Sequence, residues 1–174
     1  QGLRRRGVLV GVGTRGPNIE SKVITPFVAQ FCEVEVDTRT GEVRILRFLS
    51  ANDSGRVMSP LTYENQVFGG MTMGIGFGMS ENRILDANTG KMVNANWHDY
   101  KLPTAQDVAV RFTCVPIDPK DTEFNTVGCK GIGEPATIPT AAAISNAVYH
   151  ATGVRVTDPS INPVQMAQKL WARR

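Results

Sequence analysis

The 174-residue sequence contains few of the side chains that commonly bind metal ions. It has only two histidines, which excludes a histidine-rich metal site. Its three cysteines, Cys32, Cys114 and Cys129, are far apart and form no Cys-x-x-Cys pair, so neither a zinc site nor a disulfide framework is indicated. We instead expect reduced thiols in a reducing compartment, and therefore a cytoplasmic location.

Long apolar runs and a large excess of charge are also absent. No run of about 18 apolar residues occurs, so no membrane-spanning segment is predicted. Lysine and arginine number 19 against 16 aspartate and glutamate, and the net charge of +3 gives no argument for binding nucleic acid. The sequence begins at Gln1 without an initiator methionine or an apolar signal segment, from which we expect a piece of a longer protein or a processed subunit.

Alternation of apolar and polar residues predicts β-structure in several stretches. The alternation is interrupted by turn residues at Asp37–Gly41, where glycine supplies a positive φ, and apolar residues then resume. A similar turn occurs at Asp86–Gly90. The predicted elements are a β-hairpin over 27–50, a second hairpin over 83–93, and strands over 108–115 and 154–157.

Proline and glycine positions predict the helices. Pro60 and Pro139 stand where helices begin, Gly153 ends the second helix, and Asn162 caps a third that starts at Pro163. The helices are expected over 60 to about 80, from 139 to 153, and from 163 onward, with a long loop over 116–135. A loop of that length in a compact domain is usually functional or disordered. The fold class is α+β, with hairpins or a mixed sheet packed by helices in one domain over 1–174.

Several polar and sulfur-containing side chains are expected to have structural roles. The four methionines expected to fill gaps in the core are Met58, Met71, Met73 and Met79. Asn52, Asp53 and Arg56 are expected to make structural hydrogen bonds. His98 and Asp99 suggest a base with an orienting carboxylate, but adjacent side chains rarely point at each other. No serine lies in a Gly-x-Ser-x-Gly elbow, so a hydrolase of that type is not indicated.

The motif Gly11-x-Gly13-x-x-Gly16 fits the dinucleotide-binding pattern and follows an apolar run. That fingerprint needs a helix beginning at the second glycine, so that the helix N-terminus meets the pyrophosphate. Pro17 and a polar stretch without helical periodicity follow instead. A turn joining two strands explains the motif better.

The segment Gly131-Ile132-Gly133-Glu134-Pro135 is the most informative one. Its glycines allow backbone amides to approach an anionic or planar group closely, and the carboxylate of Glu134 suits a general base. A structural role, as a glutamate stabilised by a nearby helix N-terminus, is equally compatible with this pattern. Gln66 offers two donors and an acceptor to a pterin-like edge, although local pattern alone favours a polar residue in a packed helix.

Four segments in order resemble one family. They are Phe31–Ile45, Asp53–Pro60 with Gln66 following, Asn96–Thr104, and Lys130–Pro135 before an alanine-rich helix. Together they are similar to the C-terminal part of the molybdenum-binding subunit of the xanthine dehydrogenase/aldehyde oxidase family, the molybdenum hydroxylases. One departure is Ser59-Pro60, where many relatives have Asn-Pro.

The resemblance implies an oxidoreductase that hydroxylates an aldehyde or N-heteroaromatic substrate with oxygen from water. Glu134 would be the catalytic base. The residues implied in binding the molybdopterin cofactor, in its cytosine dinucleotide form, are Gln66, Gly69, Gly70, Lys130, Gly131, Ile132 and Gly133. No side chain of this chain is implied as a ligand of the molybdenum.

The resemblance also implies partners. They are the upstream part of the molybdenum-binding subunit and domains or subunits with 2Fe-2S clusters and FAD, in an oligomer. The alternative is a non-catalytic folded fragment or scaffold subunit without bound cofactor.

Overall fold

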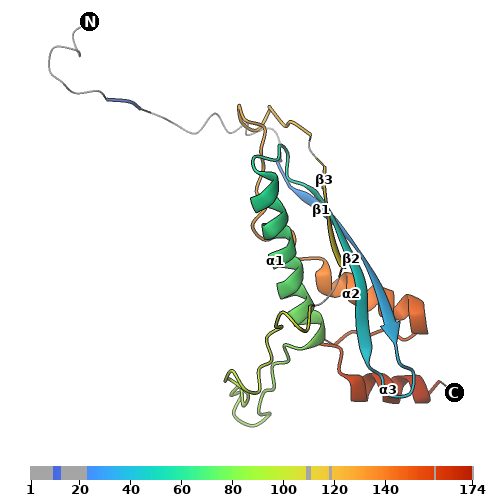
Figure 1. Cartoon of the computed structure of the whole chain (residues 1–174). Helices are drawn as coiled ribbons and strands as arrows, with labels where there is room; N and C mark the ends of the chain where they lie inside the picture. The colour runs from blue at the N-terminus through green and yellow to red at the C-terminus, as the bar shows by residue number, and fades with distance from the viewer. Residues whose placement is uncertain (1–9, 13–22, 109–110, 118, 159, 174) are drawn as a thin grey trace, which may run out of the picture.

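The computed structural model describes residues 10–12, 23–108, 111–117, 119–158 and 160–173 (Figure 1). Its elements in chain order are β1 (Phe27–Val36), β2 (Val43–Asp53), α1 (Pro60–Met79), β3 (Arg111–Ile117), α2 (Thr140–Thr152) and α3 (Pro163–Trp171). The strands form one mixed sheet in the order β1-β2-β3, with β1 antiparallel and β3 parallel to β2. The predicted α+β class and the mixed sheet with packed helices are confirmed.

The predicted first hairpin is confirmed and extends to Asp53. Gly41 has φ +76° in its turn, and its N–H donates to the Asp37 carbonyl at 2.8 Å. An irregularity in the pairing at Glu33/Val34 shifts the register of the two strands. Successive side chains of a strand point to opposite faces, and one face of the sheet packs against the helices, where Phe48 is fully buried.

Helix α1 approaches α2 through its small residues. Gly70 and Gly74 are buried, and a Cβ atom built on Gly74 would lie 2.3 Å from the Cβ atom of Thr140. Only glycine leaves room for the second helix at this distance. The core between sheet and helices comprises Val43, Ile45, Phe48, Tyr63, Val67, Met71, Ile75, Ala136, Ile144, Val148, Val154, Ile161, Met166 and Leu170.

The predicted helix ends are confirmed. Helix α2 ends at Gly153, which adopts the left-handed conformation with φ +69°. Asn162 caps α3, because its Oδ1 accepts hydrogen bonds from the N–H groups of Val164 and Gln165 at 2.9 and 3.3 Å.

Two predicted β elements are wrong. The segment 83–93 forms the expected turn but only the single bridge Leu85–Met92, so it is not a hairpin of two strands. The segment 154–157 forms no strand in the described residues. Val154 is buried there and the Val156 carbonyl accepts from Ser145 Oγ at 2.8 Å, so packing against α2 takes the place of strand pairing.

The prediction for the methionines is half correct. Met71 is fully buried and Met79 packs against the core, whereas Met58 and Met73 are 62% and 49% exposed. Met73 shares an exposed face of α1 with Gly69 and Phe77, and Met58 precedes the helix. The glycine motif at residues 11–16 lies mostly outside the described residues. In the part of the chain that the structure describes, no helix is both long and apolar enough to cross a membrane.

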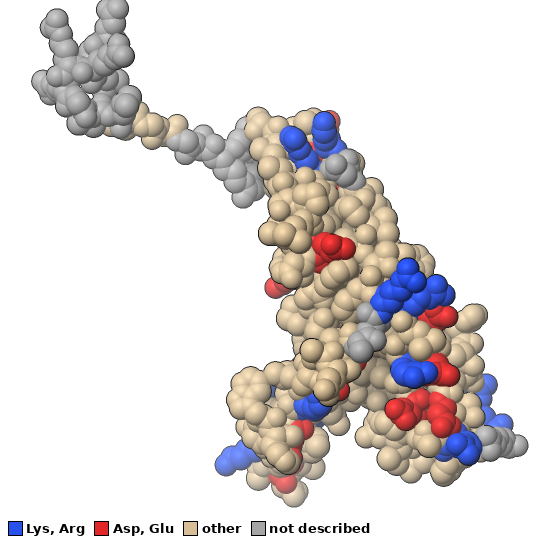
Figure 2. Space-filling view, viewed as in Figure 1, with Lys and Arg blue, Asp and Glu red and all other residues tan. Residues whose placement is uncertain are grey.

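The side of the sheet away from α2 is divided between apolar and charged residues. Figure 2 shows positive and negative side chains gathered over the end nearer α3, with mostly tan residues between them and a smaller charged group at the top of the molecule. Ion pairs Glu33–Arg47 and Glu35–Arg44 form the charged end. The apolar end carries Phe27, Phe31, Val115 and Ile117, which are 40–67% exposed.

Candidate functional site

A surface hollow of about 410 Å³ lies where the end of β2, the start of α1 and the segment 129–133 meet. It is lined by Ser54, Arg56, Met58, Ser59, Thr62, Tyr63, Gln66, Cys129, Lys130, Ile132 and Gly133. Four of the residues predicted to bind cofactor, Gln66, Lys130, Ile132 and Gly133, are thus brought together from two distant parts of the sequence.

Gln66 connects α1 directly to the glycine turn. Its Nε2 donates a hydrogen bond of 2.7 Å to the Gly133 carbonyl, across 67 positions of sequence. Gly131 and Gly133 are exposed, and a Cβ atom built on either would meet no atom within 4 Å. The backbone of this turn is therefore open to an incoming group.

Glu134 follows this turn and is exposed. Its carbonyl accepts a hydrogen bond of 2.8 Å from the Thr137 N–H, within a run of turns that ends where α2 begins at Thr140. No acidic residue lies in the first turn of α2. Glu134 itself lies outside this first turn, where the helix dipole mainly acts.

Lys130 lines the hollow, but its charge is paired within the protein. Its side chain is 10% exposed, and its Nζ lies 3.3 Å from Asp53 Oδ1 and 3.5 Å from Asp121 Oδ2. Two carboxylates therefore contact the ammonium group of this residue, which is predicted to bind the cofactor.

Gly69 and Gly70 do not line this hollow. Gly70 is buried, and a Cβ atom built on it would lie 2.8 Å from the Cβ atom of Ala136. Gly69 is exposed on another face of α1 with no atom near a built Cβ. Gly70 thus allows the turn after Glu134 to pack closely on the helix.

Several lining residues were not predicted from the sequence. Ser59, Thr62 and Tyr63 lie with Gln66 on one side of the first turns of α1, a spacing of three and four residues that a helical reading can detect. Tyr63 is buried, and its hydroxyl donates to the Asn52 carbonyl at 3.2 Å.

Of the three polar residues predicted before α1, Asn52 and Asp53 make structural hydrogen bonds and Arg56 lines the hollow. Asn52 is buried and donates to the Ser50 carbonyl at 3.1 Å, and Asp53 accepts from the Gly55 N–H at 3.2 Å, as expected of structural hydrogen bonding. The Arg56 side chain is exposed and lines the hollow instead. It places a positive charge at the edge of the site.

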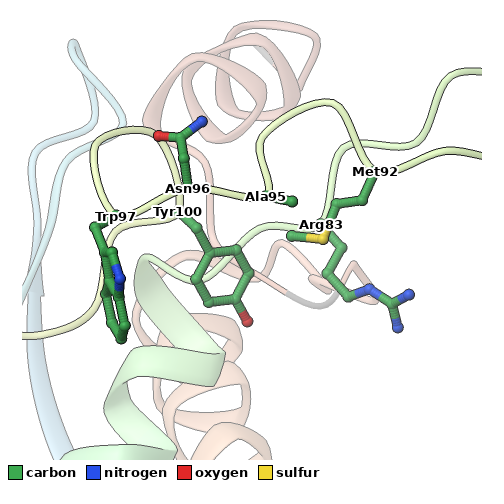
Figure 3. A pocket seen from close by; sticks show the side chains of 6 residues that line it. All are labelled: Arg83, Met92, Ala95, Asn96, Trp97 and Tyr100. Atoms are coloured by element: carbon green, nitrogen blue, oxygen red, sulfur yellow. The ribbon is translucent and has the colours of Figure 1, made fainter.

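A second hollow of about 410 Å³ lies apart from these residues, in the loops that follow α1. Figure 3 shows the ring of Tyr100 between Trp97 on one side and Met92 and Arg83 on the other. The Tyr100 hydroxyl donates to Glu81 Oε2 at 3.0 Å, which raises the pKa of Tyr100. None of the predicted site residues lies here.

His98 and Asp99 do meet, against the expectation for adjacent residues. His98 Nδ1 lies 3.0 Å from Asp99 Oδ1, in a turn where Asn96 Oδ1 accepts from both of their N–H groups. Hydrogen bonds from His98 and then Asn96 lower the pKa of Asp99. Both side chains are exposed, and neither lines the hollow that Gln66 and Gly133 line. Among the described residues, no cluster of three or more histidine, cysteine, aspartate or glutamate side chains could hold a metal ion.

Comparisons with known proteins identify relatives of this chain. Residues 11–109 match the family model of the molybdopterin cofactor-binding domain. The chain is 40% identical over 144 residues to the putative xanthine dehydrogenase molybdenum-binding subunit XdhA of Escherichia coli (strain K12), covering 82% of this chain and 19% of that protein. It is 38% identical over 144 residues to the aldehyde oxidoreductase molybdenum-binding subunit PaoC of the same strain, covering 83% and 20%.

Solved structures agree with these relatives. The reconstituted CO dehydrogenase from Oligotropha carboxidovorans superposes with a TM-score of 0.74 at 26% identity, over 86% of this chain and 19% of that chain. The chain therefore spans about a fifth of the length of the relatives that it matches.

Proposed function

This chain belongs to the molybdopterin cofactor-binding domain family, and from that premise we propose that it supplies the general base and part of the cofactor cradle of a molybdenum hydroxylase. The proposed reaction is hydroxylation of an aldehyde or an N-heteroaromatic compound, with the oxygen taken from water. Two relatives are named as subunits of a xanthine dehydrogenase and an aldehyde oxidoreductase, which supports both substrate classes.

One observation carries this proposal. The 2.7 Å hydrogen bond from Gln66 to Gly133 joins the residue proposed to grip the pterin to the turn that presents Glu134. Gln66 and Gly133 are far apart in sequence, and the fold brings both to the lining of a single hollow.

The residues of the hollow fit a pterin. Its lining combines an amide, hydroxyl groups and exposed glycine backbone, which match the alternating donors and acceptors of a planar heterocycle. The open space beside Gly131 and Gly133 leaves room for such a group. Gln66 and the backbone of Gly131–Gly133 would hold it. When bound, the molybdenum cofactor, which we propose is the cytosine dinucleotide form, supplies the two-electron redox chemistry.

Glu134 has the properties that a general base needs in this arrangement. Its carboxylate is exposed at the turn, while its backbone is fixed by hydrogen bonds at Gly133 and Glu134. It would accept a proton at its carboxylate oxygen from the water-derived nucleophile. Such proton transfer by a positioned side chain typically contributes about 10²–10⁴-fold to the rate.

The proposed partners follow from the short length of this chain, which spans only about a fifth of the relatives that it matches. The remainder of a molybdenum-binding subunit would complete the cradle and cover the apolar end of the sheet, where Phe27 and Phe31 are 67% and 65% exposed. A contiguous exposed apolar surface usually marks an interface. Electrons would leave through 2Fe-2S clusters and FAD on other domains or subunits.

The substitution Glu134→Gln in the assembled enzyme tests this function. It keeps the size of the side chain and removes the base, so turnover should fall by about 10²–10⁴-fold. Molybdenum content, measured by elemental analysis, should stay the same. Glu42→Gln is the matched control, because Glu42 is exposed at the distant β1–β2 turn. Unchanged turnover of E134Q with full molybdenum content would refute the proposed base.

A further inference from the structure

Lys130 has the least exposed lysine side chain among the ion pairs of the described residues, at 10% against 50% for Lys101 and 40% for Lys169. It lies within 3.5 Å of both Asp53 and Asp121, whose side chains are 23% and 29% exposed. Breaking a buried ion pair by removing one partner is strongly destabilising, because it leaves an uncompensated charge. Removing this lysine would leave two carboxylates near each other without a counter-ion.

The same region is also fastened through the backbone. The Lys130 N–H donates to the Ser54 carbonyl at 2.6 Å, and the Arg56 N–H donates to the Gly128 carbonyl at 2.7 Å. Gly55 has φ +64°, and a Cβ atom built on it would lie 2.3 Å from the Gly128 oxygen. The end of β2 therefore holds the segment that leads into the glycine turn, and the Lys130 side chain closes this attachment.

A second attachment lies on the other side of Glu134. Gln30 of β1 donates from Nε2 to the Ala136 carbonyl at 2.6 Å, and its Oε1 accepts from Thr140 Oγ1 at 2.7 Å. The turn that bears Glu134 is thus fixed to the sheet before and after its exposed glycines.

We propose that Lys130 is a positioning residue, which sets the place of Glu134 by holding the glycine turn to Asp53 and Asp121. This role rests on the proposed function of Glu134. A positioning role differs from a role in which Lys130 contacts the cofactor. The carboxylates of Asp53 and Asp121 together outweigh the single positive charge of Lys130 and would disfavour an anionic group beside that lysine. A small displacement of a catalytic group can lower a rate by about 10²-fold.

The test uses the assembled enzyme with Lys130→Met, Lys130→Arg, Glu134→Gln and the double variant of K130M with E134Q. Lys169→Met is the matched control, since Lys169 pairs with Asp158 on the surface at 3.1 Å. The readouts are kcat, KM, molybdenum content, and hydrogen–deuterium exchange of backbone amides in the peptide 125–139.

We expect K130M to lower kcat by about 10–100-fold, with KM changed by less than about twofold and molybdenum retained. Exchange should become faster in 125–139 and stay unchanged in α3. K130R should retain most of the activity, because a guanidinium group can contact both carboxylates. In the E134Q background K130M should lower kcat by less than about threefold further, since residues that act as one unit are not additive. K169M should behave as the unmodified enzyme.

Additive losses in the double variant, or loss of molybdenum from K130M, would overturn the positioning role. Full activity of E134Q would instead refute the general base, so the two failures are distinguishable. If K130M does not fold, Asp121→Asn carries the same test, because it removes one carboxylate and leaves the contact of Lys130 with Asp53. It should give a smaller kcat loss that is again non-additive with E134Q, and additivity would overturn the proposal.

Discussion

The surroundings of Cys32 raise the pKa of its thiol. It lies on the face of β1 that packs against the core, and burial, followed by the nearby charge of Glu33, raises the pKa of its thiol from 9.0 to about 12. Both effects disfavour the thiolate. The folded protein therefore binds the thiol proton more tightly than the unfolded chain does.

This difference predicts a stability that depends on pH. Below about pH 9 the thiol is protonated in both the folded and the unfolded protein, and its contribution to the free energy of unfolding is fully present. As pH rises from about 9 to 12 the unfolded thiol ionises first, so the free energy of unfolding should fall.

Urea unfolding of the wild type and of Cys32→Ala at pH 8 and pH 10.5 measures this effect. The stability advantage of the wild type should narrow at the higher pH. Other groups titrate equally in both proteins, so the comparison isolates the thiol. A constant difference between the two proteins would show that the thiol is not desolvated in the folded state.

At the scale of elements, the approach of α1 to α2 depends on glycine at particular positions. A Cβ atom at Gly74 would lie 2.3 and 2.6 Å from the Cβ and Oγ1 atoms of Thr140, whereas one at Gly69 would meet nothing within 4 Å. A side chain at position 74 would therefore collide with α2, whereas one at position 69 of the same helix would not.

Alanine at these positions should have opposite effects. Gly74→Ala should lower the free energy of unfolding by about 1–3 kcal/mol, because it overpacks the helix contact. Gly69→Ala should raise it by about 0.5–1 kcal/mol, because alanine loses less backbone entropy in a helix. Urea midpoints of the two variants and the wild type provide the measurement. Equal stability of G74A and the wild type would mean that α1 and α2 are not in close contact there.

At the scale of the whole molecule, one end of the sheet presents exposed apolar side chains, among them Phe27 and Phe31. Residues Phe31 and Leu49 are paired across β1 and β2, and Thr113 continues their row on β3. In a larger subunit this surface would be covered, whereas the 174-residue chain alone presents it to water.

The isolated chain should therefore self-associate at high concentration. Phe31→Thr should reduce association seen by sedimentation velocity, while changing the free energy of unfolding by no more than about 0.5–1 kcal/mol, because Phe31 is 65% exposed. Val164→Thr is the control, as Val164 is 64% exposed on α3, away from the sheet surface. If F31T and V164T associate to the same extent as the wild type, this surface is not responsible.

Much of this fold follows from the sequence because its signals are local. The turn at Asp37–Gly41, the prolines that begin helices, Gly153 and the Asn162 cap act on their own neighbours, so the hairpin and the helices of the described residues were predicted. The false strand at 154–157 had the right local pattern. A strand also needs a partner, and partners are decided by packing.

The candidate site divides in the same way. Local pattern alone favoured a polar residue in a packed helix for Gln66 and left the role of Glu134 open, and only the family resemblance of the ordered segments implied a site at both residues. Only the tertiary structure paired Lys130 with Asp53, 77 positions away, and turned Gly70 toward Ala136 while leaving Gly69 exposed. The ion pair of Lys130 and the packing of Gly70 depend on contacts between residues far apart in sequence, and the local sequence around each residue does not determine those contacts.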